Sequence, residues 1–207
     1  MRVVPEIAEG EVFRLKQARA EATRTGLIAA ARKLFVEVGY QEAGIAEIVT
    51  RAKITRGGLY YHFVEKKDLF EAVILQIVEE NQTKLIASIE PLSNNRWLHF
   101  VEALKMRLQM IASDPELQRV LVDGPAVLGW ERWNEIHTAV AITMIADEMI
   151  RMMDLNIIKH LDAEVTAHLI LALLNEASLT IAHAADQSRA LRLAIESVMA
   201  LVDGLRA

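Results

Sequence analysis

The sequence has 207 residues, 53% of them hydrophobic and 25% charged, enough to bury the core of one large domain or of two smaller ones. Cysteine is absent, which excludes disulfides and thiol nucleophiles, and the first six residues lack the layout of a signal peptide. Because no apolar run approaches the roughly 18 residues that cross a bilayer, we expect a cytoplasmic protein with no membrane partner.

Charge is distributed unevenly along the chain. Residues 14 to 67 contain eleven Lys and Arg but five Asp and Glu, whereas the whole chain has a formal net charge of -5. Such asymmetry indicates a basic module that meets a polyanion, joined to an acidic body that does not. Basic residues that merely solvate helix faces would give the same pattern, so charge alone leaves both interpretations open.

Apolar residues recur at spacings of three and four, which predicts an all-α fold. The first helix ends at Gly39, and residues 45 to 52 repeat the pattern over barely two turns. Lys53-Ile54-Thr55 then interrupts the second helix. The expected core stripe of the first helix is Ile28, Ala31, Phe35 and Val38.

Thr55 is the expected N-cap of a third, short helix whose buried contacts are Leu59 and Phe63, at i and i+4. On a helical wheel, Gly57 and Tyr61 fall on the face opposite Leu59, together with Gly58. Two short helices joined by a tight turn, with unusual outward residues on the second, are typical of a helix-turn-helix whose second helix enters a major groove.

The outward residues of this third helix suit a nucleic-acid surface. Glycines allow the backbone to approach another surface closely. Tyr60 and Tyr61 can donate hydrogen bonds to phosphates, and Arg56 has the reach and the donors to bind a guanine edge.

Lys66 and Lys67 open the next helix, where the helix dipole disfavours cations by roughly 0.3 to 1 kcal/mol. We expect this local cost to reflect an external anion. Either lysine alone could equally well extend into solvent.

The remaining sequence predicts longer helices, which brings the total to about nine. The first runs from Lys66 towards Glu90, ends at Pro91, and contains the expected seam between two domains. The predicted helices beyond it cover residues 96–112, 115–123, 130–153, 162–184 and 188–205, with a break at Gly124-Pro125.

Residues 21 to 81 resemble the N-terminal domain of the TetR family of bacterial transcriptional repressors. The restrictive part of the match is Leu-Tyr-x-His-Phe-x-x-Lys, residues 59 to 66, after a Thr-capped turn. Residues 82 to 207 resemble the ligand-binding and dimerisation domain of that family in their helix count, and residues 123–130 resemble a segment recurring in one subgroup. The other matching positions are Ala31, Phe35, Gly39, Tyr40, Ile48, Ala52, Ile54, Thr55, Gly57 and Leu69.

The resemblance implies a repressor that binds a palindromic operator in double-stranded DNA as a homodimer and is released by an unidentified small-molecule effector. It implies an N-terminal three-helix domain, with the helix-turn-helix at about residues 44–63, and no cofactor. The implied DNA contacts are Thr55, Arg56, Gly57, Gly58, Tyr60, Tyr61, His62 and Lys66.

Three positions depart from the family pattern. Gly44 replaces a usual Ser or Thr cap, Lys53 replaces a customary turn glycine, and Glu65 stands where a small capping residue is common. We therefore expect Lys53 to adopt a left-handed backbone conformation.

The last two helices are the expected dimer surface, as a four-helix bundle across a two-fold axis. Small residues there leave room for close approach, namely Ala190, Ala194 and Ser197. The expected apolar stripe on the final helix is Leu191, Ile195, Val198 and Val202.

Methionine, aromatic and polar residues on three helices of the second domain are candidate ligand contacts. Stripes of such residues are also typical of a protein core. His168 and Asn175 share a face of an otherwise apolar helix. The full candidate set is Met106, Met110, Trp130, Trp133, His137, Met144, His168 and Asn175.

Two other classes compete with a DNA-binding regulator. An enzyme is disfavoured because the sequence contains no phosphate-binding glycine loop, dinucleotide fingerprint or nucleophile elbow. No pair of histidines has the spacing of helix-borne metal ligands, so we expect no metal site. A helical adaptor that binds a ligand or a protein but not DNA remains the alternative.

Overall fold

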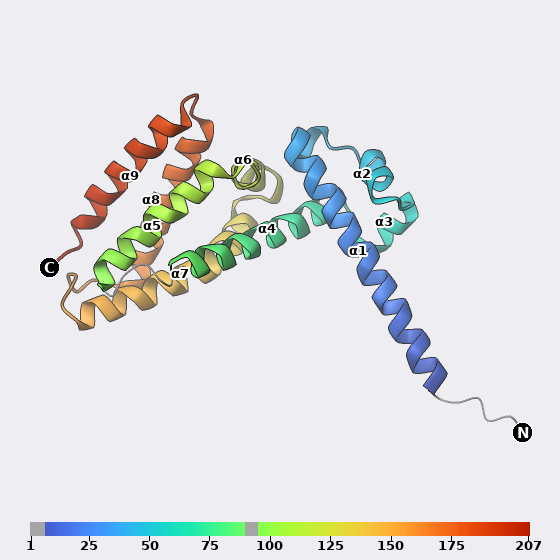
Figure 1. The fold of residues 1–207 in the computed structure, drawn as a ribbon, viewed down its shortest axis with the longest axis horizontal. Coiled ribbons are helices and arrows are strands. Elements are labelled where there is room, and N and C mark those ends of the chain that lie inside the picture. The colour runs from blue at the N-terminus through green and yellow to red at the C-terminus, as the bar shows by residue number, and fades with distance from the viewer. Residues whose placement is uncertain (1–6, 90–94) are drawn as a thin grey trace, which may run out of the picture. The chain divides into compact units, whose positions relative to one another are not determined.

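A computed structural model describes residues 7–89 and 95–207, apart from the side chains of residues 7–10 and 137–140. Within these ranges the chain forms nine helices and one isolated bridge, between Ile158 and Arg206 (Figure 1). The all-α prediction is confirmed. The helices are α1 Ile7–Glu42, α2 Ile45–Ala52, α3 Arg56–His62, α4 Lys66–Ile89, α5 Arg96–Ser113, α6 Pro115–Leu128, α7 Trp130–Asp154, α8 Ala163–His183 and α9 Gln187–Asp203.

The chain divides into two compact units, residues 1–73 and 74–207, and the division falls within α4. In the first unit, α1 packs against α2 and α3. Phe35 of α1 meets Phe70 of α4 edge to face, with ring centroids 5.1 Å apart. The buried apolar side chains of this unit include Leu27, Ala31, Leu34, Phe35, Ile48, Leu59, Phe63, Leu69 and Phe70.

Gly39 breaks α1 as the sequence predicts, because its φ of 81° and ψ of 168° lie outside the helical region. The chain then resumes a short helical turn up to Glu42. Val38, one residue before the break, is 44% exposed, so its assignment to the core stripe is wrong. The stripe shifts because the helix ends before Val38 can pack against a neighbour.

The second unit is built around α8, which packs against α5, α6, α7 and α9. Among the described helices, α8 has the length and apolar composition that could cross a membrane. Packing against these four helices accounts for part of that composition, since 39% of the apolar stretch is buried inside the unit.

Helix α6 continues through Gly124 and Pro125 to Leu128, so the predicted break there is wrong. Pro125 lies in the last turn, and its missing N–H removes one i→i−4 hydrogen bond without ending the helix. Gly124 has a packing role instead, because a Cβ at this position would overlap the indole ring of Trp133. The pair fixes α6 against α7.

Helix α9 turns the predicted dimer stripe inward. Val198 and Val202 are each 2% exposed, and Leu191 and Ile195 pack against the same core of the unit. Ala190 and Ala194 also border this core. The stripe therefore stabilises the monomer, and its assignment as a dimer surface is corrected. A one-face apolar pattern does not distinguish an internal core from a subunit interface.

Candidate functional site

The turn between α2 and α3 has a defined backbone path. Lys53 adopts the left-handed conformation, with φ 56° and ψ 40°, which confirms the sequence expectation. The Ile54 amide then donates to the Val49 carbonyl at 2.9 Å, closing the end of α2. Thr55 caps α3, since its hydroxyl oxygen accepts a hydrogen bond from the Gly58 amide at 3.1 Å.

Helix α3 has one anchored face and one exposed face. Leu59 is completely buried and Phe63 is 4% exposed, as predicted. Tyr60 is 50% exposed and Tyr61 is 80% exposed. Thr55, Arg56 and Gly57 are also exposed. The fold thus presents a short helix whose outward residues combine a guanidinium, two phenols and a residue without a side chain.

Gly58 and His62 lie at the edges of the exposed face and are half-buried. A Cβ at Gly58 would come within 2.7 Å of the Ile54 Cγ2, so this glycine is required by packing inside the protein. His62 stacks edge-on against Tyr61, with ring centroids 5.0 Å apart. Gly58 therefore has a packing role inside the unit, and its contact with DNA stays a prediction.

Lys66 is engaged within the first unit. Its Nζ donates to the carbonyl oxygens of Tyr40 at 2.8 Å and Ala43 at 3.0 Å, with Gln41 at 3.4 Å. The Nζ also lies 4.3 Å from the centroid of the Tyr40 ring. Desolvation lowers the pKa of Lys66, and Glu42 partly opposes this shift. In this structure the ammonium caps the carbonyl end of α1, and the phosphate contact of Lys66 stays a prediction.

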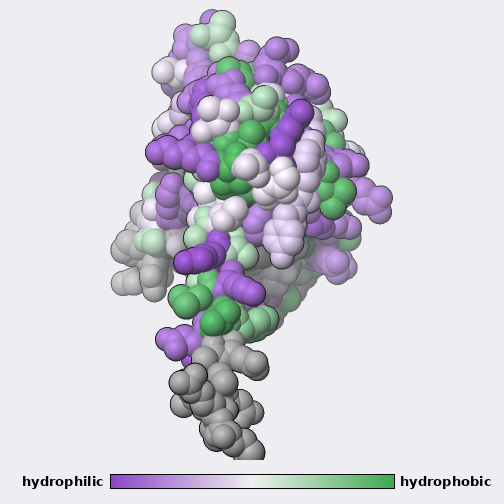
Figure 2. Space-filling model, turned by 90° about the vertical axis from the view of Figure 1, so that its right-hand side faces the viewer, coloured by the Kyte–Doolittle hydropathy of each residue, from purple (hydrophilic) through white to green (hydrophobic). Residues whose placement is uncertain are grey.

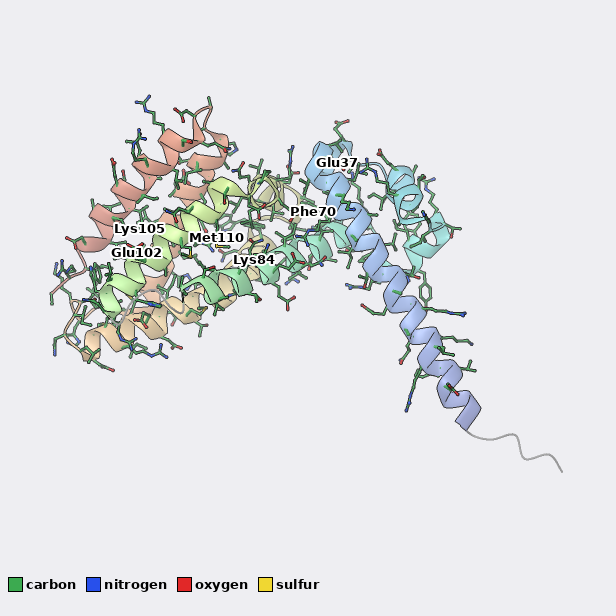
Figure 3. All side chains as sticks on the ribbon, in the orientation of Figure 1. Glu37, Phe70, Lys84, Glu102, Lys105 and Met110 are labelled. Atoms are coloured by element: carbon green, nitrogen blue, oxygen red, sulfur yellow. The ribbon has the colours of Figure 1, made fainter. Side chains whose placement is uncertain are left out.

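Arg51 holds α2 against α1. Its guanidinium lies 2.7 Å from Glu37 and 2.6 Å from Glu47, and the hydrogen bonds to these carboxylates raise the pKa of Arg51. Figure 3 labels Glu37 in the part of α1 nearest α2. All three side chains are partly exposed to solvent, so this cluster orients the two helices more than it stabilises them.

The N-terminal turns of α1 run past the end of α3. Arg14, Gln17 and Glu21 line a shallow hollow together with Tyr61 and His62. This stretch also exposes apolar side chains, visible in Figure 2 as green atoms next to the grey atoms. The exposed apolar residues are Val12 at 50%, Phe13 at 61% and Leu15 at 56%. Arg14 of α1 therefore adjoins the exposed face of α3.

A cavity of about 440 Å³ lies in the second unit, within the size range of small-molecule sites. Side chains from α4, α5, α6, α7 and α8 line it, and most of them are apolar. Figure 3 shows one of the lining residues, Met110, on α5. The polar lining residues include Asn81 and Gln82 from α4, His99 and Arg107 from α5, and Glu148 and Arg151 from α7.

The structure brings only some of the predicted ligand residues to this cavity. Met110 and Met144 line it, and Asn175 reaches it indirectly by accepting a hydrogen bond from Arg107 at 3.3 Å. Trp133 packs on Gly124 in the core, and Trp130 is 69% exposed. His168 is exposed on α8, Met106 is not among the lining residues, and the side chain of His137 lies outside the described residues.

Arg107 is the functional candidate that sequence reasoning missed. Burial of its guanidinium lowers the pKa of Arg107 to about 10. A signal was present, since Phe100, Leu104, Leu108 and Ile111 form the buried stripe of α5 and a charged residue interrupts it at the i+3 position from Leu104. In the described part of the chain, no three His, Cys, Asp or Glu side chains cluster in a way that could hold a metal ion.

These observations define a class of protein, a helix-turn-helix unit followed by a helical unit that encloses a cavity. Residues 27–73 match the family described as bacterial regulatory proteins, tetR family, and residues 97–205 match the tetracyclin repressor-like C-terminal domain. The chain therefore belongs to the TetR family, a family of transcriptional regulators rather than of enzymes.

Solved and curated relatives agree with this assignment. A crystal structure of a TetR-family transcriptional regulator from Pectobacterium atrosepticum is 32% identical, covers 92% of this chain and 97% of its own, and superposes with a TM-score of 0.80. The HTH-type transcriptional regulator UidR of Escherichia coli strain K12 is 33% identical over 51% of each chain. The HTH-type transcriptional repressor BepR of Brucella suis is 30% identical over 52% of each chain.

The chain spans about half the length of these two curated relatives. The similarity therefore does not by itself assign the activity or the partners of these relatives to this chain.

The role of Lys66 can be measured through stability. We expect Lys66→Met to lower the free energy of unfolding by about 1 to 3 kcal/mol, because partly buried carbonyls at the end of α1 lose their donor. Urea unfolding followed by far-UV circular dichroism gives this value. Lys67→Met is the matched control and should change stability by less than about 0.5 kcal/mol. Equal losses in the two variants would contradict the capping role.

Proposed function

We propose that this protein is a cytoplasmic repressor that binds a palindromic operator as a homodimer and releases it when a small molecule enters the cavity of the second unit. The observation that supports this most is the exposed face of α3. Buried Leu59 and Phe63 anchor the helix, while Arg56, Tyr60 and Tyr61 point away from the core. Such a face has little use in a helical adaptor but suits a major groove.

Each exposed residue has a proposed role at the duplex. Arg56 can bond guanine O6 and N7, and Thr55 and the Gly57 backbone can approach a phosphate. Tyr60 and Tyr61 can donate to phosphates or cover sugars and thymine methyl groups. Among the residues that the resemblance implies, Gly58 and Lys66 have internal roles. His62 is proposed to orient Tyr61 through their edge-on contact.

The homodimer is proposed to form through the outer faces of α8 and α9. Leu169 on α8 is 66% exposed, and Leu201 on α9 is 64% exposed. On α9, Leu193, Ser197 and Leu201 recur every four residues on the side opposite the core stripe. A two-fold dimer carries two copies of α3, which suits a palindromic operator whose half-sites are about 34 to 36 Å apart.

Helix α4 is the proposed route from cavity to DNA. Its first turns contribute Leu69 and Phe70 to the core of the first unit, and its later residues, from Val78 to Ile89, contribute to the cavity wall. A ligand in the cavity that binds better to one position of these later turns would shift the whole helix towards that position. The spacing of the two α3 helices in the dimer would then depend on the occupant.

Tyr61 provides the first test of the DNA contact. Genomic fragments retained by the purified protein should yield one palindromic sequence, and Tyr61→Ala should bind that sequence about tenfold or more weakly, because a donor to phosphate is lost. Fluorescence anisotropy with a labelled duplex measures the affinity. The melting temperature should not change, since the side chain is 80% exposed.

The matched control is Val38→Ala, which truncates an exposed apolar side chain of α1 outside the proposed contact set. It should bind the operator as the wild type does. Operator affinity that is the same in wild type and Tyr61→Ala would overturn the proposed contact surface.

The dimer surface is tested separately by Leu169→Glu and Leu201→Glu. Each variant places a carboxylate in the proposed interface, so we expect a monomer by light scattering and an operator affinity at least about tenfold lower, because only one half-site is then held. Leu155→Glu is the control, as Leu155 is 60% exposed but lies at the end of α7. A dimer that persists in both interface variants would refute this face.

A further inference from the structure

The cavity of the second unit is elongated, with polar groups at separate points along it. The α5 residues that line it run from His99 to Ile111, a span of about 18 Å at 1.5 Å per residue. Arg96, before His99 at the start of α5, pairs with Glu148 of α7 at 2.8 Å. The polar side chains of α7 therefore lie near the His99 end, and Arg107 lies about 12 Å further along the helix.

At the His99 end the charges compensate each other. Glu148 is bound by Arg96 at 2.8 Å and approached by Arg151 at 3.5 Å. These arginines are partly exposed, and an incoming anion would have to compete with a carboxylate that already holds them. This end gives little reason to prefer a charged ligand.

Arg107 is more deeply buried than Arg96 and Arg151. Its Nε is shielded from solvent, and the desolvation that lowers its pKa is the cost of placing a guanidinium inside the unit. The wall of the cavity is mostly apolar and includes Leu104, Met110 and Leu174. Asn175 orients the group from α8 through a neutral amide oxygen. A guanidinium in a low-dielectric wall interacts strongly with an anion that enters the cavity.

We propose that the effector is an organic anion with an apolar body, and that its carboxylate or equivalent acidic group pairs with the Arg107 guanidinium. The apolar body lies along the wall formed by α5 and the later turns of α4. This inference rests on the proposed function, in which the cavity is the effector site. It adds the chemical class of the ligand and the residue that recognises its charge.

The test uses acids and their neutral counterparts with the same skeleton. Octanoate, decanoate and 2-naphthoate are each compared with the corresponding primary amide by isothermal titration calorimetry at pH 7. Wild-type protein should bind at least one acid about 10- to 100-fold more tightly than its amide, the range expected for a charge-assisted hydrogen bond. No acid preference in any of the three pairs would overturn the proposal.

Two variants assign the preference to Arg107. Arg107→Met should remove the acid preference, and Arg107→Lys should keep part of it because the charge remains. Arg192→Met, which replaces an exposed arginine of α9, should behave as the wild type. An acid preference that survives in a folded Arg107→Met protein would contradict the proposal. If Arg107→Met does not fold, Arg107→Lys decides: loss of the acid preference in the folded Lys variant would also contradict it.

Operator binding by ligand-free protein separates this inference from the function on which it rests. If the protein retains a palindromic fragment but shows no acid preference, the ligand class is wrong and the regulator stands. An acid that binds through Arg107 to a protein without affinity for any fragment would support the ligand class and refute the regulator.

Discussion

Leu59 and Phe63 hold α3 against the rest of the first unit, and their burial determines which side chains of this helix face outward. A seven-residue helix is too short to be stable alone, so its orientation comes from this packing and from the Thr55 cap. The exposed face then follows from helical geometry, since residues four apart share a side. Substituting an exposed residue changes the chemistry of the exposed face of α3. Substituting Leu59 or Phe63 instead changes the position of the helix.

Some basic residues of the first unit bind groups within the unit, and others are exposed to solvent. Arg51 is bound by two carboxylates and Lys66 by backbone carbonyls, so neither side chain depends on an external anion. Arg56 is exposed on α3. The positive charge of the segment therefore overstates the number of groups available to a polyanion. Counting charges predicts the kind of partner, but contacts within the fold decide which charges reach it.

Sequence patterns predicted well wherever one local cause dominates. The left-handed Lys53, the Thr55 cap and the break at Gly39 each follow from backbone chemistry at one position. The predictions failed where a distant partner decides. Gly124 does not break α6 but makes room for Trp133, nine residues further along the sequence. Val198 and Val202 pack inside their own unit, although their spacing would suit an interface equally well.

The cavity shows the same limit. Stripes of Met and aromatic residues selected Met110 and Met144 correctly as lining residues but also selected Trp133, which belongs to the core, and exposed Trp130. The more informative signal was a charge within an apolar stripe, at Arg107. A buried cation is costly unless something compensates it, so such an interruption identifies a polar site more specifically than a run of large apolar residues does.

The central claim is that two copies of the first unit, each presenting the outward face of α3 and the exposed Lys and Arg side chains around it, neutralise phosphates of a duplex. The dependence of affinity on salt tests it most directly, with the retained palindromic fragment as the duplex. If 6 to 10 phosphates are neutralised, affinity should fall by about 10³- to 10⁵-fold between 50 and 200 mM salt. An affinity that stays constant over this range would contradict the account and favour a helical adaptor that does not bind DNA.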